Sequence, residues 1–195
     1  KVPRAISIIL LGGIVSAFIG PSVANFSKDM FSNHMYVGSY LSLAALTFLP
    51  TIFFLFYKNT SKIEISIKYS GRSYLELVSQ PRFLQAVISS AFGYAIMTFL
   101  MTGTPLSMHV MEGISLNKTS IVIQIHVACM FLPSLIAGNL IKKIGHSKMM
   151  YVGVGLYCIT VIISLFDQSF LNYMLALIFL GFGWNFLFIS GTSLL

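Results

Sequence analysis

Long apolar stretches alternate with shorter polar segments along this chain of 195 residues. Six of the stretches contain no Asp, Glu, Lys or Arg. Each holds about 18 to 26 residues, enough for a helix that crosses the ~30 Å hydrocarbon core of a bilayer. Because one charge at the bilayer centre costs roughly 2.5 to 3.5 kcal/mol, this pattern predicts an all-α membrane protein with six transmembrane helices. The predicted spans are residues 5–26, 36–57, 83–108, 120–141, 149–166 and 170–194.

The basic residues fall in alternate gaps between these spans. Segments 1–4, 58–82 and 142–148 hold ten of the twelve Lys and Arg residues, and the remaining gaps hold Lys28 and Lys118. Cytoplasmic loops are enriched in Lys and Arg, so the first three segments are predicted to face the cytoplasm. Six crossings then place both ends of the chain on that side.

The composition excludes several other classes of protein. Hydrophobic residues make up 56% of the chain and charged residues 9%, whereas soluble domains carry about 25% charged residues. The net charge of +7 comes from basic residues beside span ends, and no basic face with interleaved aromatic residues predicts nucleic-acid binding. Cys129 and Cys158 lie within predicted spans and form no Cys-x-x-Cys pair, so neither a zinc site nor another cofactor is predicted. Signatures such as His-Glu-x-x-His and Gly-x-Ser-x-Gly are also missing, and no enzyme is predicted.

One polar segment is much longer than the others. Residues 58–82 are therefore predicted to separate two helical bundles. Within the segment, Tyr74–Val78 is predicted to form a short helix along the membrane surface. Pro81 is predicted to begin the next span, because proline is tolerated in a first helical turn. The chain does not begin with Met, and its last span reaches Leu195 without a flanking charge, so we expect a piece of a longer protein.

Small residues recur every four positions in the first span, at Gly12, Ser16, Gly20 and Ala24, and therefore share one helix face. Pro21 directly follows Gly20 and removes a backbone donor, which predicts a bend. Two interpretations stay open: a packing seam against another helix, or a hinge that seals or opens a pathway. The segment around Gly20 and Pro21 resembles the Gly-Pro motif in the fifth helix of antiporters of the major facilitator superfamily.

A second resemblance lies between the fourth and fifth spans. The segment 138–148 is similar to the cytoplasmic loop signature of the same superfamily, in which two glycines enclose an acidic and a basic residue. Gly138, Lys143 and Gly145 match this signature in register, whereas Lys142 stands where the family often has Asp. The charge pattern also places this segment on the cytoplasmic side, where the family has its loop.

The resemblance implies that the six spans correspond to helices five to ten of a twelve-helix transporter. Residues 1–57 would supply the last two helices of the N-terminal bundle, residues 58–82 the cytoplasmic linker, and residues 83–195 the first four helices of the C-terminal bundle. Segments near Thr102 and Gly183 also look like those of bacterial members, which implies a multi-pass protein of the bacterial inner membrane.

Polar side chains inside the spans are the candidates for a transport pathway, because unpaired polar groups in hydrocarbon are costly and usually face the bundle interior or water. Tyr94, Thr98 and Thr102 recur at a spacing of four and share one helix face; the threonines alternatively bond their own backbone. Trp184 and Asn185 lie among glycines that leave room for a cavity or a close helix crossing. The candidates are Asn25, Tyr94, Thr98, Thr102, Gln124, His126, Trp184 and Asn185.

His126 is the one histidine deep within a predicted span. Its imidazole titrates near neutral pH, so it is a candidate for coupling transport to a proton; the alternative role is a hydrogen bond between helices. Gln124 lies two residues away and therefore points to a different face.

We therefore predict a secondary transporter that moves a small solute by alternating access, with a proton as the candidate coupling ion and the lipid bilayer as its surroundings. The alternative that stays open is a six-helix channel or a membrane subunit that transports nothing, because neither needs a coupling charge in this region.

Overall fold

The computed structural model describes residues 2–32, 34–57 and 73–194, with side chains from residue 12 onward. Within these ranges the secondary structure is helical and contains no strand, so the predicted all-α class is confirmed. Two parts of the chain are compact in themselves. One joins residues 1–19 to 75–195, and the other comprises residues 20–74.

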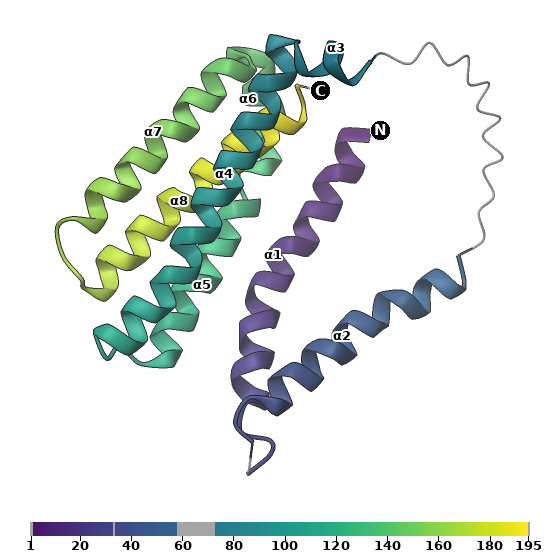
Figure 1. Cartoon of the computed structure of the whole chain (residues 1–195). Coiled ribbons are helices and arrows are strands. Elements are labelled where there is room, and N and C mark those ends of the chain that lie inside the picture. Colours follow the sequence, from purple (N-terminus) through teal and green to yellow (C-terminus); the bar gives the residue numbers. More distant parts are fainter. Residues whose placement is uncertain (1, 33, 58–72, 195) are drawn as a thin grey trace. The chain divides into compact units, whose positions relative to one another are not determined.

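The smaller part contains the end of α1 (Val2–Ser27) and all of α2 (Val37–Leu55). Tyr36 precedes α2 with φ 71°, a left-handed conformation that reverses the chain. Gly38 lies directly against the Ser27 carbonyl, where a Cβ would overlap the backbone. The Ser39 hydroxyl donates to the Ala24 carbonyl at 2.6 Å. These contacts hold the end of α1 against the start of α2, next to the turn between them (Figure 1).

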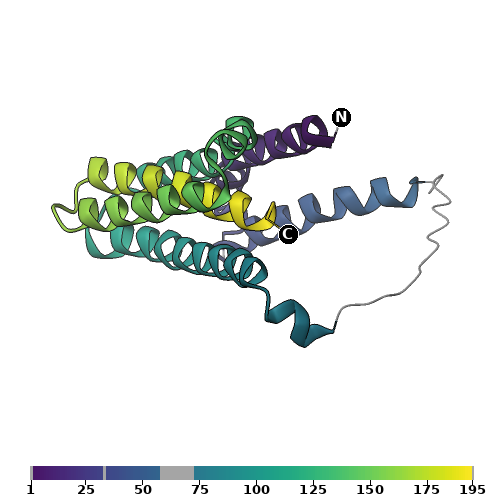
Figure 2. The same cartoon turned by 90° about the horizontal axis from the view of Figure 1, so that it is seen from above.

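The larger part is a helical bundle in which α8 occupies the central position, in contact with α4, α5 and α7 (Figures 1 and 2). Its elements are α3 (Tyr74–Val78), α4 (Pro81–Leu106), the π-helical turn η1 (Ser107–Met111), α5 (Leu116–Phe131), α6 (Ser134–Ile144), α7 (His146–Ser164) and α8 (Phe170–Thr192). The predicted short helix at Tyr74–Val78 and the predicted start of a span at Pro81 are both confirmed.

Four described helices are long and apolar enough to cross a membrane, or five if α5 and α6 form one bent span. The four are Val37–Leu55, Pro81–Met111, His146–Ser164 and Phe170–Thr192. The predicted first span coincides with α1, whose side chains before residue 12 lie outside the described residues. The chain is therefore a multi-pass membrane protein, and the number six stays a prediction.

The predicted fourth span is broken at Pro133. α5 ends at Phe131, α6 begins at Ser134, and the two axes differ by 42°. Proline cannot donate to the carbonyl one turn before it, so a continuous helix is disfavoured here.

The predicted gap over residues 142–148 is mostly helical in the structure. The segment is helical up to Ile144, and a single residue, Gly145 with φ 87°, turns the chain into α7. α6 buries Ala137 and Ile141 beside Met149, and this apolar contact favours helix over loop.

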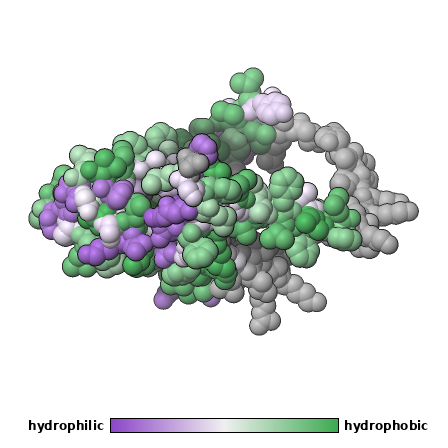
Figure 3. Space-filling model, turned by 90° about the horizontal axis from the view of Figure 1, so that it is seen from below, coloured by the Kyte–Doolittle hydropathy of each residue, from purple (hydrophilic) through white to green (hydrophobic). Residues whose placement is uncertain are grey.

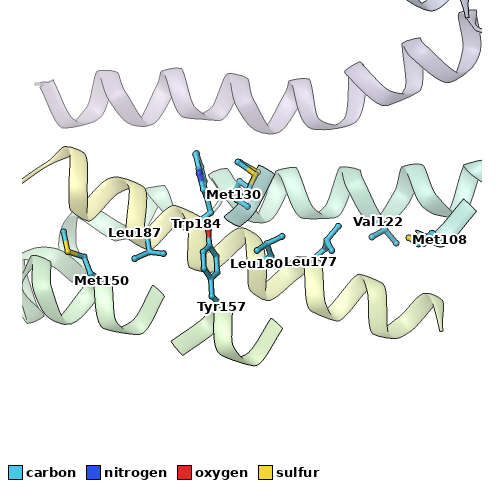
Figure 4. Close-up of a cluster of buried hydrophobic side chains, with 10 residues drawn as sticks. Met108, Val122, Met130, Met150, Tyr157, Leu177, Leu180, Trp184 and Leu187 are labelled. Atoms are coloured by element: carbon cyan, nitrogen blue, oxygen red, sulfur yellow. The ribbon is translucent and has the colours of Figure 1, made fainter. Parts of the chain in front are cut away.

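The core of the bundle lies along α8. Leu177, Leu180, Trp184 and Leu187 project from it towards neighbouring helices, where they meet side chains such as Tyr157 (Figure 4). Many large apolar side chains outside this core are exposed, and Figure 3 shows broad apolar surfaces with hydrophilic residues gathered in one region. Exposed apolar surface of this extent fits a helix bundle that has lipid as its solvent.

Candidate functional site

Three glycines bring α8 close to three different helices. A Cβ on Gly181 would lie 2.8 Å from the His126 carbonyl oxygen of α5, and one on Gly183 would lie 2.6 Å from the Tyr157 ring of α7. Gly191 meets the backbone of α4 in the same way. Of the two roles expected for glycines in this span, the close crossing is what the structure shows, and it fixes the side chains of α8 with respect to the other helices.

His126 lies in the seam between α5 and α8 and is fully buried. Its ring Nδ1 is 2.8 Å from the Leu177 carbonyl oxygen of α8, and its Nε2 has no partner among the described residues. The expected interhelical hydrogen bond is therefore present. Gln124 instead donates to the Phe18 carbonyl of α1 at 3.4 Å, so the two side chains lie on different faces, as predicted.

Asn185 lies opposite the break at Pro133 and is 1% exposed. Its Nδ2 donates to the Met130 carbonyl and to the Ser134 hydroxyl, both at 2.6 Å. In a continuous helix the Met130 carbonyl would accept from the amide of Ser134. Asn185 supplies the missing donor, so the bend between α5 and α6 is held by a side chain of α8.

Trp184 lies at the centre of an aromatic cluster built from three helices. Its ring stacks on Phe188 of α8, with centroids 4.9 Å apart and planes 11° apart. Phe131 of α5 meets it edge-on at 6.3 Å. We call Phe131, Trp184 and Phe188 the aromatic wall. Trp184 is 7% exposed, and its Nε1 has no hydrogen-bond partner among the described residues.

Tyr94 of α4 joins this cluster from the side, with the two ring centroids 6.2 Å apart and the ring planes at 60°, but is itself 52% exposed. Thr98 and Thr102 continue the same face of α4 and are also exposed. None of the three hydroxyls makes a hydrogen bond among the described residues, whereas Thr104 on the buried face donates to the Leu100 carbonyl at 2.8 Å. We call Tyr94, Thr98 and Thr102 the hydroxyl row.

Another side of α4 faces α7 across an open groove of about 720 Å³. The groove is lined mainly by apolar side chains such as Ile96 and Val154. Two hydroxyls there are bonded to backbone, since Ser89 donates to the Leu187 carbonyl at 3.2 Å and Tyr157 to the Gly93 carbonyl at 2.6 Å. The α4–α7 groove therefore presents an apolar surface that suits lipid chains or another helix.

The other predicted residues lie away from this cluster. Asn25 is half-buried near the end of α1, and Gly20 borders a small hollow of the α1–α2 hairpin. Pro21 lies within the same helix. Gly138, Lys142 and Lys143 belong to α6, with the two lysines in its last turn, and Gly145 forms the turn after it. Cations at a helix C-terminus are favourable, and this placement accounts for the lysines structurally.

Sequence reasoning missed Phe131, Phe188 and Ser134, because their roles depend on neighbours from other helices. A spacing signal was available for one of them: Phe188 follows Trp184 by four residues and therefore lies on the same face of α8. The described residues contain no group of three His, Cys, Asp or Glu side chains placed to hold a metal ion. The cluster instead places aromatic rings beside hydroxyls that make no hydrogen bond among the described residues.

Comparison with known proteins identifies three relatives of this chain. The chain is 38% identical over 193 residues to the riboflavin transporter RfnT of Brucella anthropi, which covers 98% of the chain and 48% of that protein. It is 26% identical over 209 residues to the uncharacterized MFS-type transporter YddS of Bacillus subtilis, and this match covers 98% of the chain and 48% of YddS. It is 35% identical over 102 residues to YdeG, another uncharacterized MFS-type transporter of that organism, covering 51% of the chain and 24% of YdeG.

No solved structure matches the chain. The chain spans about half the length of RfnT and YddS, the relatives that it matches over nearly all of its residues. The family model described as Major Facilitator Superfamily matches residues 1–195. The chain therefore belongs to the major facilitator superfamily.

Proposed function

We propose that this chain is part of a secondary transporter that moves riboflavin, or a solute of similar chemistry, across the bacterial inner membrane by alternating access. The observation that carries the proposal is the 38% identity to a riboflavin transporter over 98% of the chain. Identity at that level over so long a stretch supports a related substrate as well as a shared fold.

The hydroxyl row supports a pathway on this side of α4. Unbonded polar groups that face lipid carry a desolvation cost, and polar residues in membrane helices therefore usually face the bundle interior or a water-filled cavity. Tyr94, Thr98 and Thr102 are exposed in the described bundle and make no hydrogen bond within it. Water or a solute in a pathway would supply their missing partners.

The domain arrangement belongs to the same proposal. Residues 1–57 form the end of one helical bundle, residues 83–195 begin the second, and residues 58–82 connect the two on the cytoplasmic side. The two bundles rock about a site near the middle of the membrane, so that the site opens to each side in turn.

The test is the uptake of radiolabelled riboflavin into riboflavin-auxotrophic bacteria that express the full-length protein. Saturable uptake above that of cells with an empty vector is expected. Proteoliposomes loaded with unlabelled riboflavin should also show a transient excess of labelled riboflavin inside, because a carrier exchanges solute across alternating states. A channel equilibrates label without such an excess, so its absence would favour the channel alternative, and no uptake at all would overturn riboflavin as the substrate.

Proton coupling through His126 is the second part of the proposal. Nδ1 is held by the Leu177 carbonyl, and Nε2 has no partner among the described residues. This arrangement leaves one nitrogen to accept a proton when the seam between α5 and α8 rearranges. His126→Asn keeps a donor near the position of Nδ1 but cannot take up a proton. Riboflavin uptake by this variant should lose its dependence on an imposed proton gradient; uptake with unchanged gradient dependence would contradict the assignment.

A further inference from the structure

We propose that the flat ring system of the solute stacks on Tyr94 beside the aromatic wall, and that Thr98 and Thr102 bind its polar edge or tail. This inference rests on the proposed transport of a riboflavin-like solute and assigns residues to its recognition. The ligand class is a planar heteroaromatic ring with carbonyl and N–H groups along one edge and a flexible polyhydroxyl chain.

The aromatic wall is held in place by contacts within the bundle. Trp184 is fixed on one side by its stacking on Phe188 and on another by the edge of Phe131. Close crossings at Gly181 and Gly183 hold the helix that carries it. A rigid wall loses little conformational freedom when a ligand binds, which improves affinity.

Tyr94 is the member of the cluster that a solute can reach. Its ring touches Trp184 edge-on at 6.2 Å and is therefore oriented, yet 52% of the side chain is exposed. Aromatic side chains are a general platform for flat rings, and stacking works with many ring types because each has a π-face. The exposed ring of Tyr94 thus supplies apolar contact for the centre of a heteroaromatic solute.

The two threonines extend from this platform along the helix. Thr98 and Thr102 follow Tyr94 by four and eight residues, which corresponds to roughly 6 Å and 12 Å along the axis. Each hydroxyl offers one donor and two acceptor positions. These groups match the carbonyl, N–H and hydroxyl groups of a riboflavin-like molecule over a comparable length.

The α4–α7 groove suits this solute less well. Its hydroxyls at Ser89 and Tyr157 are already bonded to backbone carbonyls, and the side chains around them are mainly apolar. Gln85 and Ser147 also line the groove, but the Gln85 amide nitrogen already donates to the Ser147 hydroxyl at 2.9 Å. A ligand with a polar edge would therefore lose hydrogen bonds to water there and find few to replace them.

The experiment is a fluorescence titration of riboflavin with purified full-length protein in nanodiscs, because stacking on an aromatic side chain quenches flavin emission. Tyr94→Leu is expected to raise the Kd about tenfold, which corresponds to about 1.4 kcal/mol. Tyr94→Phe keeps the ring and should stay within about twofold of the wild type. Thr98→Val should raise the Kd severalfold without abolishing the quenching.

The matched control is Phe99→Leu, which removes an aromatic ring from a neighbouring position of α4 that is 77% exposed and outside the cluster. It should leave the Kd unchanged. Equal effects of Tyr94→Leu and Phe99→Leu, with both variants monodisperse and equally heat-stable, would overturn the inference.

If the wild-type protein does not bind riboflavin, the proposed substrate fails. The same variants are then titrated with lumichrome, a flat fluorescent ring without the polyhydroxyl chain. A Tyr94-dependent Kd for lumichrome would retain the stacking site, and no binding of either probe would reject it.

Discussion

Two sides of α4 carry hydroxyl groups, and the two sets differ in whether those groups are bonded. On the side of the α4–α7 groove, Ser89 and Tyr157 place their hydroxyls against backbone carbonyls of neighbouring helices. On the other side, Tyr94, Thr98 and Thr102 are exposed and make no hydrogen bond among the described residues. Bonded hydroxyls stabilise helix packing, whereas the unbonded hydroxyls can form hydrogen bonds with a polar partner from outside the described bundle.

Polarity alone therefore does not mark a transport pathway in a membrane helix. Both sides of α4 contain residues that a hydropathy profile treats alike. What separates them is the pairing across helices: the hydroxyls of Ser89 and Tyr157 are bonded and can face lipid, whereas the hydroxyl row requires water or solute. The experiments below alter one side at a time.

The largest contrast is expected from a charge on each side. Ile96 faces the groove, and Thr98 belongs to the hydroxyl row two residues later. Ile96→Lys should lower the amount of membrane-inserted protein, in line with the roughly 2.5 to 3.5 kcal/mol for Lys at a helix centre. Thr98→Lys should insert almost normally, because water is available, but should lose riboflavin uptake. The measurement is membrane-fraction abundance beside uptake; equal loss of insertion would show that both sides face lipid.

A second experiment disrupts the close crossing of α7 and α8, which positions the helices on both sides of α4. Gly183→Leu would drive a side chain into the Tyr157 ring, and overpacking of this kind costs typically about 1 to 3 kcal/mol. The expected result is a lower melting temperature and loss of uptake. Gly155→Leu on α7 is the control, because a Cβ at Gly155 meets nothing within 4 Å, and this variant should melt like the wild type. A Gly183→Leu protein as heat-stable as the control would contradict the close crossing of α7 and α8.

Thiol labelling compares the water exposure of the two sides directly. Cys129 and Cys158 are first replaced by Ser, and a single cysteine is then placed at position 98 or 96. Thr98→Cys should react with a membrane-impermeant methanethiosulfonate at least about tenfold faster than Ile96→Cys, because the reactive thiolate forms in water and not in lipid. Excess riboflavin should slow the reaction at position 98. Similar rates at both positions would remove the distinction between pathway and groove.

Much of the helical framework was predictable from the sequence. Uncharged apolar runs located the helices within a few residues, because lipid requires that every backbone group be bonded within the helix. Pro81 marked a helix start, since proline acts through its own chemistry and needs no distant partner. The four-residue spacing of Tyr94, Thr98 and Thr102 was also enough to predict that they share a face.

The contacts between helices were not predictable in the same way. Asn185 was singled out as polar, but its bonds to Met130 and Ser134 depend on how far α5 and α8 slide along each other. The aromatic wall likewise joins Phe131 to Trp184 across more than fifty residues of sequence. The predicted gap at residues 142–148 was too long for a related reason, because Ala137 and Ile141 gain burial beside Met149 of α7 that no local pattern reveals.

The smallest expected effects come from removing single hydroxyls, one bonded and one unbonded, and comparing the melting temperature and the KM of the two variants. Tyr157→Phe removes the 2.6 Å hydrogen bond to the Gly93 carbonyl, and such bonds between membrane helices average about 0.6 kcal/mol. This variant should melt at a slightly lower temperature than the wild type and keep its KM for riboflavin.

Thr98→Val removes a hydroxyl that has no hydrogen bond among the described residues, so it should melt like the wild type and show a raised KM. Each variant is therefore the control for the other, measured by thermal unfolding and initial uptake rates. If Thr98→Val lowered the melting temperature as much as Tyr157→Phe and left the KM unchanged, the Thr98 hydroxyl would have a structural partner, and the pathway would have to be sought elsewhere on the bundle.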